Sequence, residues 1–154
     1  MSGGWRGGGG RKGRDPRGRR GCCDLETLEK VIEALLEASS EGAAIIVEGE
    51  RDELSLRKLG ITGAVLCAAR RPALEVAEEA ARNFKAVVVL TDWDRAGEEL
   101  ARKVAEHLLA AGARVDLDTR ERLKRMVRRE IKDVESLSGF VERARAERSP
   151  KDLP

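Results

Sequence analysis

Short apolar runs alternate with amphipathic segments along most of this chain. Four runs have the length and β-branched content of buried strands: 43–48, 62–67, 86–91 and 113–117. Between them, apolar residues recur at helical spacing in three segments: 51–59, 72–83 and 95–111. Such alternation calls for parallel strands joined by right-handed crossovers. The pattern therefore predicts an α/β fold with an about four-stranded, mainly parallel sheet flanked by helices.

Composition divides the chain into four predicted segments. They are a Gly/Arg-rich tail at 1–21, a leading helix within 22–41, a core at 42–118, and a helical segment with a short tail at 119–154. The first segment holds nine of the sixteen glycines and seven basic residues against Asp15. It has too little apolar surface to offset the entropy of ordering, so we expect disorder. Two interpretations stay open for it: an RNA-binding tail or a solubilising extension.

The length and composition of the chain exclude several classes of protein. The chain has 154 residues with 41% apolar content, which suits one core. No apolar run approaches the about 18 residues that cross a bilayer, and no secretion signal is visible, so we expect a cytoplasmic protein. The three cysteines lack zinc-site spacing, and His107 lies in a helical pattern. Charged residues make up 38%, which with few amides indicates a thermophile source.

Carboxylates follow two of the predicted strands directly. Glu48 ends the first, and Asp92 and Asp94 end the third. Ligands of open parallel sheets bind beyond the carboxyl ends of the strands, so these acids are expected to meet there. Converging carboxylates repel one another unless a cation neutralises them, and an all-oxygen set suits Mg²⁺ or Mn²⁺. The alternative is that acids at strand ends merely cap the next helix.

Two motifs carry a family resemblance. Glu48-Gly49-Glu50-Arg51-Asp52 follows the first strand, and Asp92-Trp93-Asp94-Arg95-Ala96-Gly97 follows the third. Together they resemble the Toprim domain over about residues 42–118. That domain is shared by type IA and type II topoisomerases, bacterial-type primases, overcoming-lysogenization-defect nucleases and ribosomal-RNA maturation ribonucleases. The chain is most similar to the small stand-alone Toprim proteins of archaea and some bacteria, and the resemblance implies a Rossmann-like fold.

The resemblance also implies roles for individual residues. Glu48 would act as general acid or base and contact metal, while Asp92 and Asp94 would hold Mg²⁺. Gly49 and Gly97 would let backbone approach a phosphate closely. Asp52 is either a further site residue or a helix cap. The implied partner is nucleic acid, RNA or DNA, with a larger processing complex as a further expectation.

Basic residues also collect where the acids are expected. Four arginines fall just after strand ends and are candidates to hold phosphate: Arg51, Arg70, Arg71 and Arg95. They could equally balance the acids in ion pairs. Residues 119–132 carry seven basic residues against two acids, which predicts a helix with a basic face. A nucleic-acid backbone could lie along this face, but we favour a solvated one. Trp93 either stacks on a base or shields the turn, and Glu50 and Glu98 are expected at the solvated surface.

The departures from the family narrow the function. Topoisomerases of the family bond DNA to a tyrosine, and this chain has no tyrosine. Ala96 stands where they place a third acid. The resemblance therefore favours a metal-dependent nuclease or nucleotidyltransferase acting on phosphodiester bonds. The alternatives are a non-catalytic nucleic-acid-binding or accessory module, and a phosphatase of the haloacid-dehalogenase type with Asp92 as nucleophile, which Ala96 disfavours.

Overall fold

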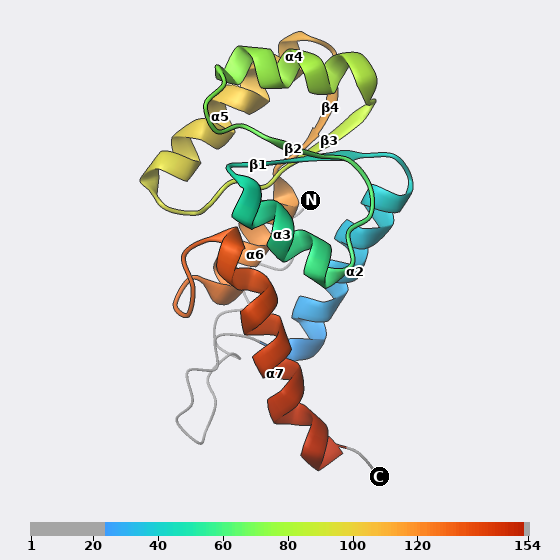
Figure 1. Ribbon diagram of the computed structural model, residues 1–154, viewed down its shortest axis with the longest axis vertical. Helices are drawn as coiled ribbons and strands as arrows, with labels where there is room; N and C mark the ends of the chain where they lie inside the picture. The colour runs from blue at the N-terminus through green and yellow to red at the C-terminus, as the bar shows by residue number, and fades with distance from the viewer. Residues whose placement is uncertain (1–23, 153–154) are drawn as a thin grey trace, which may run out of the picture.

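The computed structural model describes residues 24–152, and a parallel sheet runs through its centre (Figure 1). Within that part of the chain the sheet has four strands in the order β2-β1-β3-β4. The strands are β1 (Ala44–Val47), β2 (Val65–Cys67), β3 (Ala86–Val89) and β4 (Arg114–Asp116). All three pairings are parallel, which confirms the predicted α/β fold. The central strands β1 and β3 lie side by side, so their carboxyl ends are neighbours.

Helices cover both faces of the sheet, as Figure 1 shows. One face carries α4 (Ala73–Asn83) and α5 (Arg95–Ala110). The other carries the remaining helical elements: α2 (Leu25–Ser40), α3 (Glu50–Leu59), α6 (Asp118–Val127), the 3-10 turn η2 (Val134–Ser136) and α7 (Leu137–Asp152). Strand β1 shows the two-residue period behind this layering. Ile45 and Val47 pack toward α2 and α6, whereas Ile46 packs toward α4 and α5.

Each predicted strand and helix is present, with the strands shorter than expected. The run 86–91 pairs as a strand only to Val89, although the amide of Leu90 still donates to the carbonyl of Ile46 at 2.8 Å. Beyond Leu90 the backbone turns away to present the acids. Pro72 precedes α4 instead of opening it. The predicted tail at 1–21 lies outside the described residues. No helix between residues 24 and 152 is both long and apolar enough to cross a bilayer.

The leading and C-terminal helices share the core with the sheet. From α2, Leu28 and Ile32 are buried against β1 and β3. From the C-terminal part, Leu123, Val134 and Leu137 belong to the same cluster. The sequence division at residue 118 therefore does not separate two packing units: the segment after it completes one face of the sheet.

Leu123→Ala tests how far the core depends on α6. Leu123 is fully buried, so the change should lower the free energy of unfolding by about 2–5 kcal/mol, through lost apolar burial and the cavity left behind. Leu109→Ala is the matched control, because Leu109 is 63% exposed on α5 and should change stability by no more than about 0.5 kcal/mol. Urea denaturation followed by circular dichroism measures both. Equal effects would contradict a core that extends into the C-terminal segment.

Candidate metal centre

The predicted acids meet at the carboxyl edge of the sheet. Glu48 follows β1, and Asp92 and Asp94 follow the neighbouring strand β3. The backbone amide of Asp92 donates to Glu48 Oε2 at 3.1 Å, which joins the two strand ends directly. The arrangement predicted from the strand pattern is thus present in space.

Backbone amides orient each carboxylate. Asp92 Oδ1 accepts from the amide of Val134 at 3.0 Å, and Asp94 Oδ1 accepts from the amide of Gly97 at 2.8 Å, which caps α5. In each of the three acids, Glu48, Asp92 and Asp94, one carboxylate oxygen accepts a hydrogen bond from a backbone amide. The second oxygen of each accepts no hydrogen bond from the described residues. Three aimed oxygens therefore remain available for a ligand.

Gly97 is required by a close contact with the Asp92 backbone. A Cβ atom at this position would lie 1.9 Å from the carbonyl oxygen of Asp92 and 3.0 Å from Glu48 Oε2. Any side chain would push on the turn that carries the aspartates. The sequence suggested glycine here for approach to a phosphate, whereas the structure shows that Gly97 packs the first turn of α5 onto the Asp92 carbonyl. Gly49 differs, since a Cβ there would meet nothing within 4 Å.

Burial, with a smaller contribution from neighbouring carboxylates, raises the pKa values of Asp92 and Glu48. Burial, with the neighbouring charges of Asp52 and Glu48, raises the pKa of Asp92 to about 7. Burial is also the main cause of the raised pKa of Glu48, and the carboxylate of Asp94 adds to it. The site therefore holds negative charge that nearby protein cations do not fully compensate. A divalent cation would relieve that imbalance.

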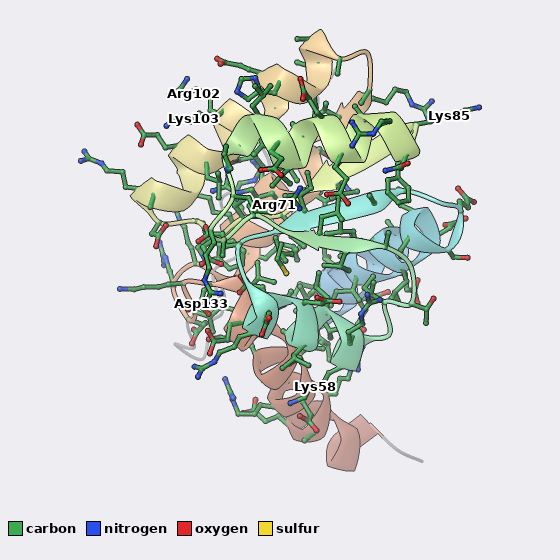
Figure 2. The ribbon with its side chains drawn as sticks, turned by 45° about the horizontal axis from the view of Figure 1, so that its top comes forward. Lys58, Arg71, Lys85, Arg102, Lys103 and Asp133 are labelled. Atoms are coloured by element: carbon green, nitrogen blue, oxygen red, sulfur yellow. The ribbon has the colours of Figure 1, made fainter. Side chains whose placement is uncertain are left out.

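Asp52 and the η2 segment extend the acidic site. Asp52 is buried at the start of α3, and its Oδ2 accepts from the amide of Gly49 at 3.0 Å, so the expected capping interaction is present. Burial raises its pKa, and the charges of Asp133 and Glu135 contribute. Figure 2 shows Asp133 beside this edge of the molecule. Sequence reasoning missed both η2 acids, because they follow no strand and lie far along the chain from the two motifs.

Arg120 is the other residue that sequence reasoning missed. It is only 2% exposed, and its guanidinium donates to the carbonyl oxygens of Thr91 and Asp92 at 3.0 and 2.6 Å. It also pairs with Glu98 at 3.3 Å and Glu121 at 3.1 Å. The expected basic face of α6 thus contains one arginine that is internal and holds the aspartate turn. Glu98, expected at the solvated surface, is instead tied to Arg120 and Lys124.

An open cleft of about 500 Å³ lies at this edge of the sheet, and Asp94 is not among the residues that line it. Glu48, Asp52 and Asp92 line it, with Arg51 and Arg70 at its walls. Arg51 is loosely paired with Glu135 at 3.6 Å, and Arg70 has a left-handed φ of 64°. Holding a non-glycine residue in that conformation costs about 1–3 kcal/mol, and such strain clusters at functional sites. Two of the four candidate arginines therefore lie at the acids.

The other candidates are placed differently. Arg71 lies beside α4 (Figure 2), where it pairs with Glu79 at 2.7 Å and Glu75 at 3.7 Å, and it does not line the cleft. Arg95 opens α5 and does not line the cleft. Trp93 is 8% exposed, and its indole N–H donates to the carbonyl of Ile131 at 2.9 Å. The largely buried indole therefore shields the turn.

The protein atoms alone do not form a closed metal cage. Between residues 24 and 152, no three histidine, cysteine, aspartate or glutamate side chains are grouped so as to hold an ion. Mg²⁺ commonly takes one or two protein carboxylates and fills its remaining positions with water and phosphate oxygens. Asp92 and Asp94, with their free oxygens, match that mode of binding.

Gly97→Ala should damage both the fold and the site. The added Cβ forces the Asp92 carbonyl to move, so we expect a loss of about 2 kcal/mol or more in the free energy of unfolding. Gly49→Ala is the control, with an expected change below about 1 kcal/mol because only the helix cap is affected. Chemical denaturation of the two variants gives the comparison. Equal stability of the two would contradict the close contact at Asp92.

Comparisons with known proteins agree with this geometry. The Toprim domain pattern matches residues 43–139. A UPF0292 protein of Methanosarcina barkeri is 43% identical over 121 residues, which cover 79% of this chain and 85% of the relative. A UPF0292 protein of Pyrococcus abyssi is 47% identical over 109 residues, or 70% and 82% of the two chains.

A solved structure gives the same result for the fold. A putative protein from Aquifex aeolicus superposes with a TM-score of 0.61 at 30% identity, over 71% of this chain and 96% of that one. The span that matches the Toprim domain pattern begins just before β1 and extends into α7. It therefore includes Val134, whose amide orients Asp92. The chain belongs to the Toprim domain family.

Proposed function

We propose that this protein is a Mg²⁺-dependent Toprim enzyme that cleaves or transfers at phosphodiester bonds of nucleic acid. Toprim domains in general bind divalent metal ions, and the family supports a nucleic-acid-related function. The observation that carries the proposal is the hydrogen bond between Glu48 and the amide of Asp92. This hydrogen bond brings the Glu48 carboxyl next to Asp92 and supports the proposal that Glu48 exchanges a proton beside carboxylates that have free oxygens.

The residues present fit a hard divalent cation. The donor atoms are all carboxylate oxygens, which suit Mg²⁺ and also Mn²⁺. Asp92 and Asp94 would hold the ion through the oxygens that no amide occupies. When bound there, the ion would stabilise negative charge that develops on phosphate oxygens.

The chain's own residues supply the remaining chemistry. Glu48 Oε2 is engaged by the Asp92 amide, which leaves Oε1 to take or give a proton. The pKa of Glu48 is raised, mainly by burial, which makes its protonated form easier to reach than in an exposed glutamate, as a general acid or base requires. Arg51 and Arg70 would hold the phosphate against the cleft wall. Arg120 keeps the aspartate turn in place from behind.

Loss of the acids should abolish turnover. We expect Glu48→Gln and Asp92→Asn each to lower the rate by at least about 100-fold, because one removes proton transfer and the other a metal ligand. Glu99→Gln, at an exposed position of α5, is the control and should keep the native rate. The assay is cleavage of end-labelled RNA and DNA with Mg²⁺, Mn²⁺ or EDTA. Native turnover by either site variant would remove the assignment, and inactivity of every protein on every substrate would favour a binding module.

Asp92→Asn should stabilise the metal-free protein. The folded pKa of about 7 exceeds the ordinary 3.8, so ionisation of Asp92 costs stability at pH 8 and nothing below about pH 4. Asparagine removes that cost and keeps an acceptor for the Val134 amide. We expect a gain on the order of 1 kcal/mol at pH 8, reduced from the full shift because solvent screens this partly exposed group.

Metal should reverse the ranking of the two proteins. Mg²⁺ binds the folded state of the wild type and should raise its melting temperature, while the Asp92→Asn variant should respond much less. Denaturation at pH 4 and pH 8, with and without Mg²⁺, gives both results. Wild type that is as stable as the variant at pH 8 without metal would contradict the crowding of charge at Asp92.

A further inference from the structure

A second pocket lies on the other side of the aspartate turn. It has a volume of about 460 Å³ and is lined by Trp93, Asp94, Lys124, Arg128, Arg129 and Lys132. We call it the basic pocket, since four of these side chains are cations and one is an acid. Asp92 lines the acidic cleft and Asp94 lines the basic pocket, so the turn between them forms a shared wall.

Two hydrogen bonds fix the basic pocket to the turn. The indole N–H of Trp93 donates to the carbonyl of Ile131, and the amide of Val134 donates to Asp92 Oδ1. The loop between α6 and η2, which carries Arg129 and Lys132, is therefore held to the aspartate turn at Ile131 within the loop and at Val134 just after it. A ligand bound at the acids would meet these cations in a set position.

Most of the cations in the basic pocket are not used within the fold. Lys124 pairs with Glu98. Arg128, Arg129 and Lys132 are exposed and form no ion pair with any residue from 24 to 152. The helix dipole stabilises positive charge near the C-terminal end of α6. That effect is limited to the last turn and does not account for Lys132, which lies beyond the helix.

We propose that the basic pocket binds a backbone phosphate of a nucleic-acid strand, next to the phosphate that Arg51 and Arg70 would hold in the acidic cleft. This inference rests on the proposed function. Guanidinium groups bind phosphate through paired hydrogen bonds, and cations without internal partners release counterions when a polyanion arrives. The strand would cross the aspartate turn, with one phosphate between Arg51 and Arg70 and the following contact among Arg128, Arg129 and Lys132.

Oligonucleotide binding in EDTA tests the pocket without turnover. The full chain is titrated against a fluorescein-labelled oligonucleotide in RNA and in DNA form, and anisotropy is followed over a range of salt. The test variant is Arg128→Ala/Arg129→Ala/Lys132→Ala. The control is Lys58→Ala/Lys85→Ala/Lys103→Ala, which removes the same charge from three separate places on the surface (Figure 2). Both variants keep the basic residues 1–21.

The test variant should bind about tenfold or more weakly, and the slope of log affinity against log salt should fall by about 2, because up to three phosphate contacts are lost. The control should change affinity by less than about threefold, through net charge alone. A loss with RNA, DNA or both supports the pocket and shows which strand it takes. Equal binding by test and control variants would overturn it, as would displacement of the oligonucleotide by polyglutamate at equal charge.

A separate measurement keeps this result apart from the proposed function. The test variant should retain the rise in melting temperature with Mg²⁺, since its exposed side chains do not hold the carboxylates. Loss of that response would show that the substitutions disturb the aspartate turn. It would overturn the proposal that Arg128, Arg129 and Lys132 serve only to bind phosphate. Failure of every protein to cleave would remove the enzyme assignment, while a selective binding defect in the test variant would still support the basic pocket.

Discussion

Asp92 is held in place by four separate parts of the chain. Its amide donates to Glu48 at the end of β1, and its carbonyl accepts from Arg120 of α6 while packing on Gly97 of α5. Its side chain accepts from the amide of Val134 in η2. Because each contact comes from a different element, the position of one carboxylate depends on the sheet and on helices from both of its faces. The geometry of the site is thereby a property of the whole fold.

The arrangement of charge follows from this constraint. A carboxylate fixed beside Glu48 and Asp52, and half removed from water, is unfavourable in the absence of a cation. Arg120 offsets this charge only in part: its charge lowers the pKa of Glu48, but its guanidinium donates to backbone carbonyls and pairs with Glu98 and Glu121 rather than with the site carboxylates. Ionisation of these carboxylates thus lowers the stability of the ligand-free protein, and a bound cation would restore it, as expected where binding and stability compete.

Part of the site could be predicted from the sequence alone. Strand periodicity placed Glu48, Asp92 and Asp94 at one sheet edge, because side chains that follow parallel strands must lie there. It could not find Arg120, Asp133 or Glu135. Arg120 contacts backbone 28 and 29 positions away, and Asp133 and Glu135 act on Asp52 from 81 and 83 positions away. A buried arginine and exposed ones look alike in a basic helix, and only the packing of Leu123 and Val127 shows which side of α6 faces inward.

The C-terminal segment also determines when the site can form during synthesis. A chain made from its N-terminus completes β3 and both aspartates well before η2, whose amide orients Asp92, and before Leu137 and Val141 cover that face of the sheet. The amide of Ser138 further ties the start of α7 to Ser55 of α3. Domains emerging from a ribosome fold as units. Nascent chains that stop short of η2 would therefore carry both acidic motifs before the amide that orients Asp92 is in place.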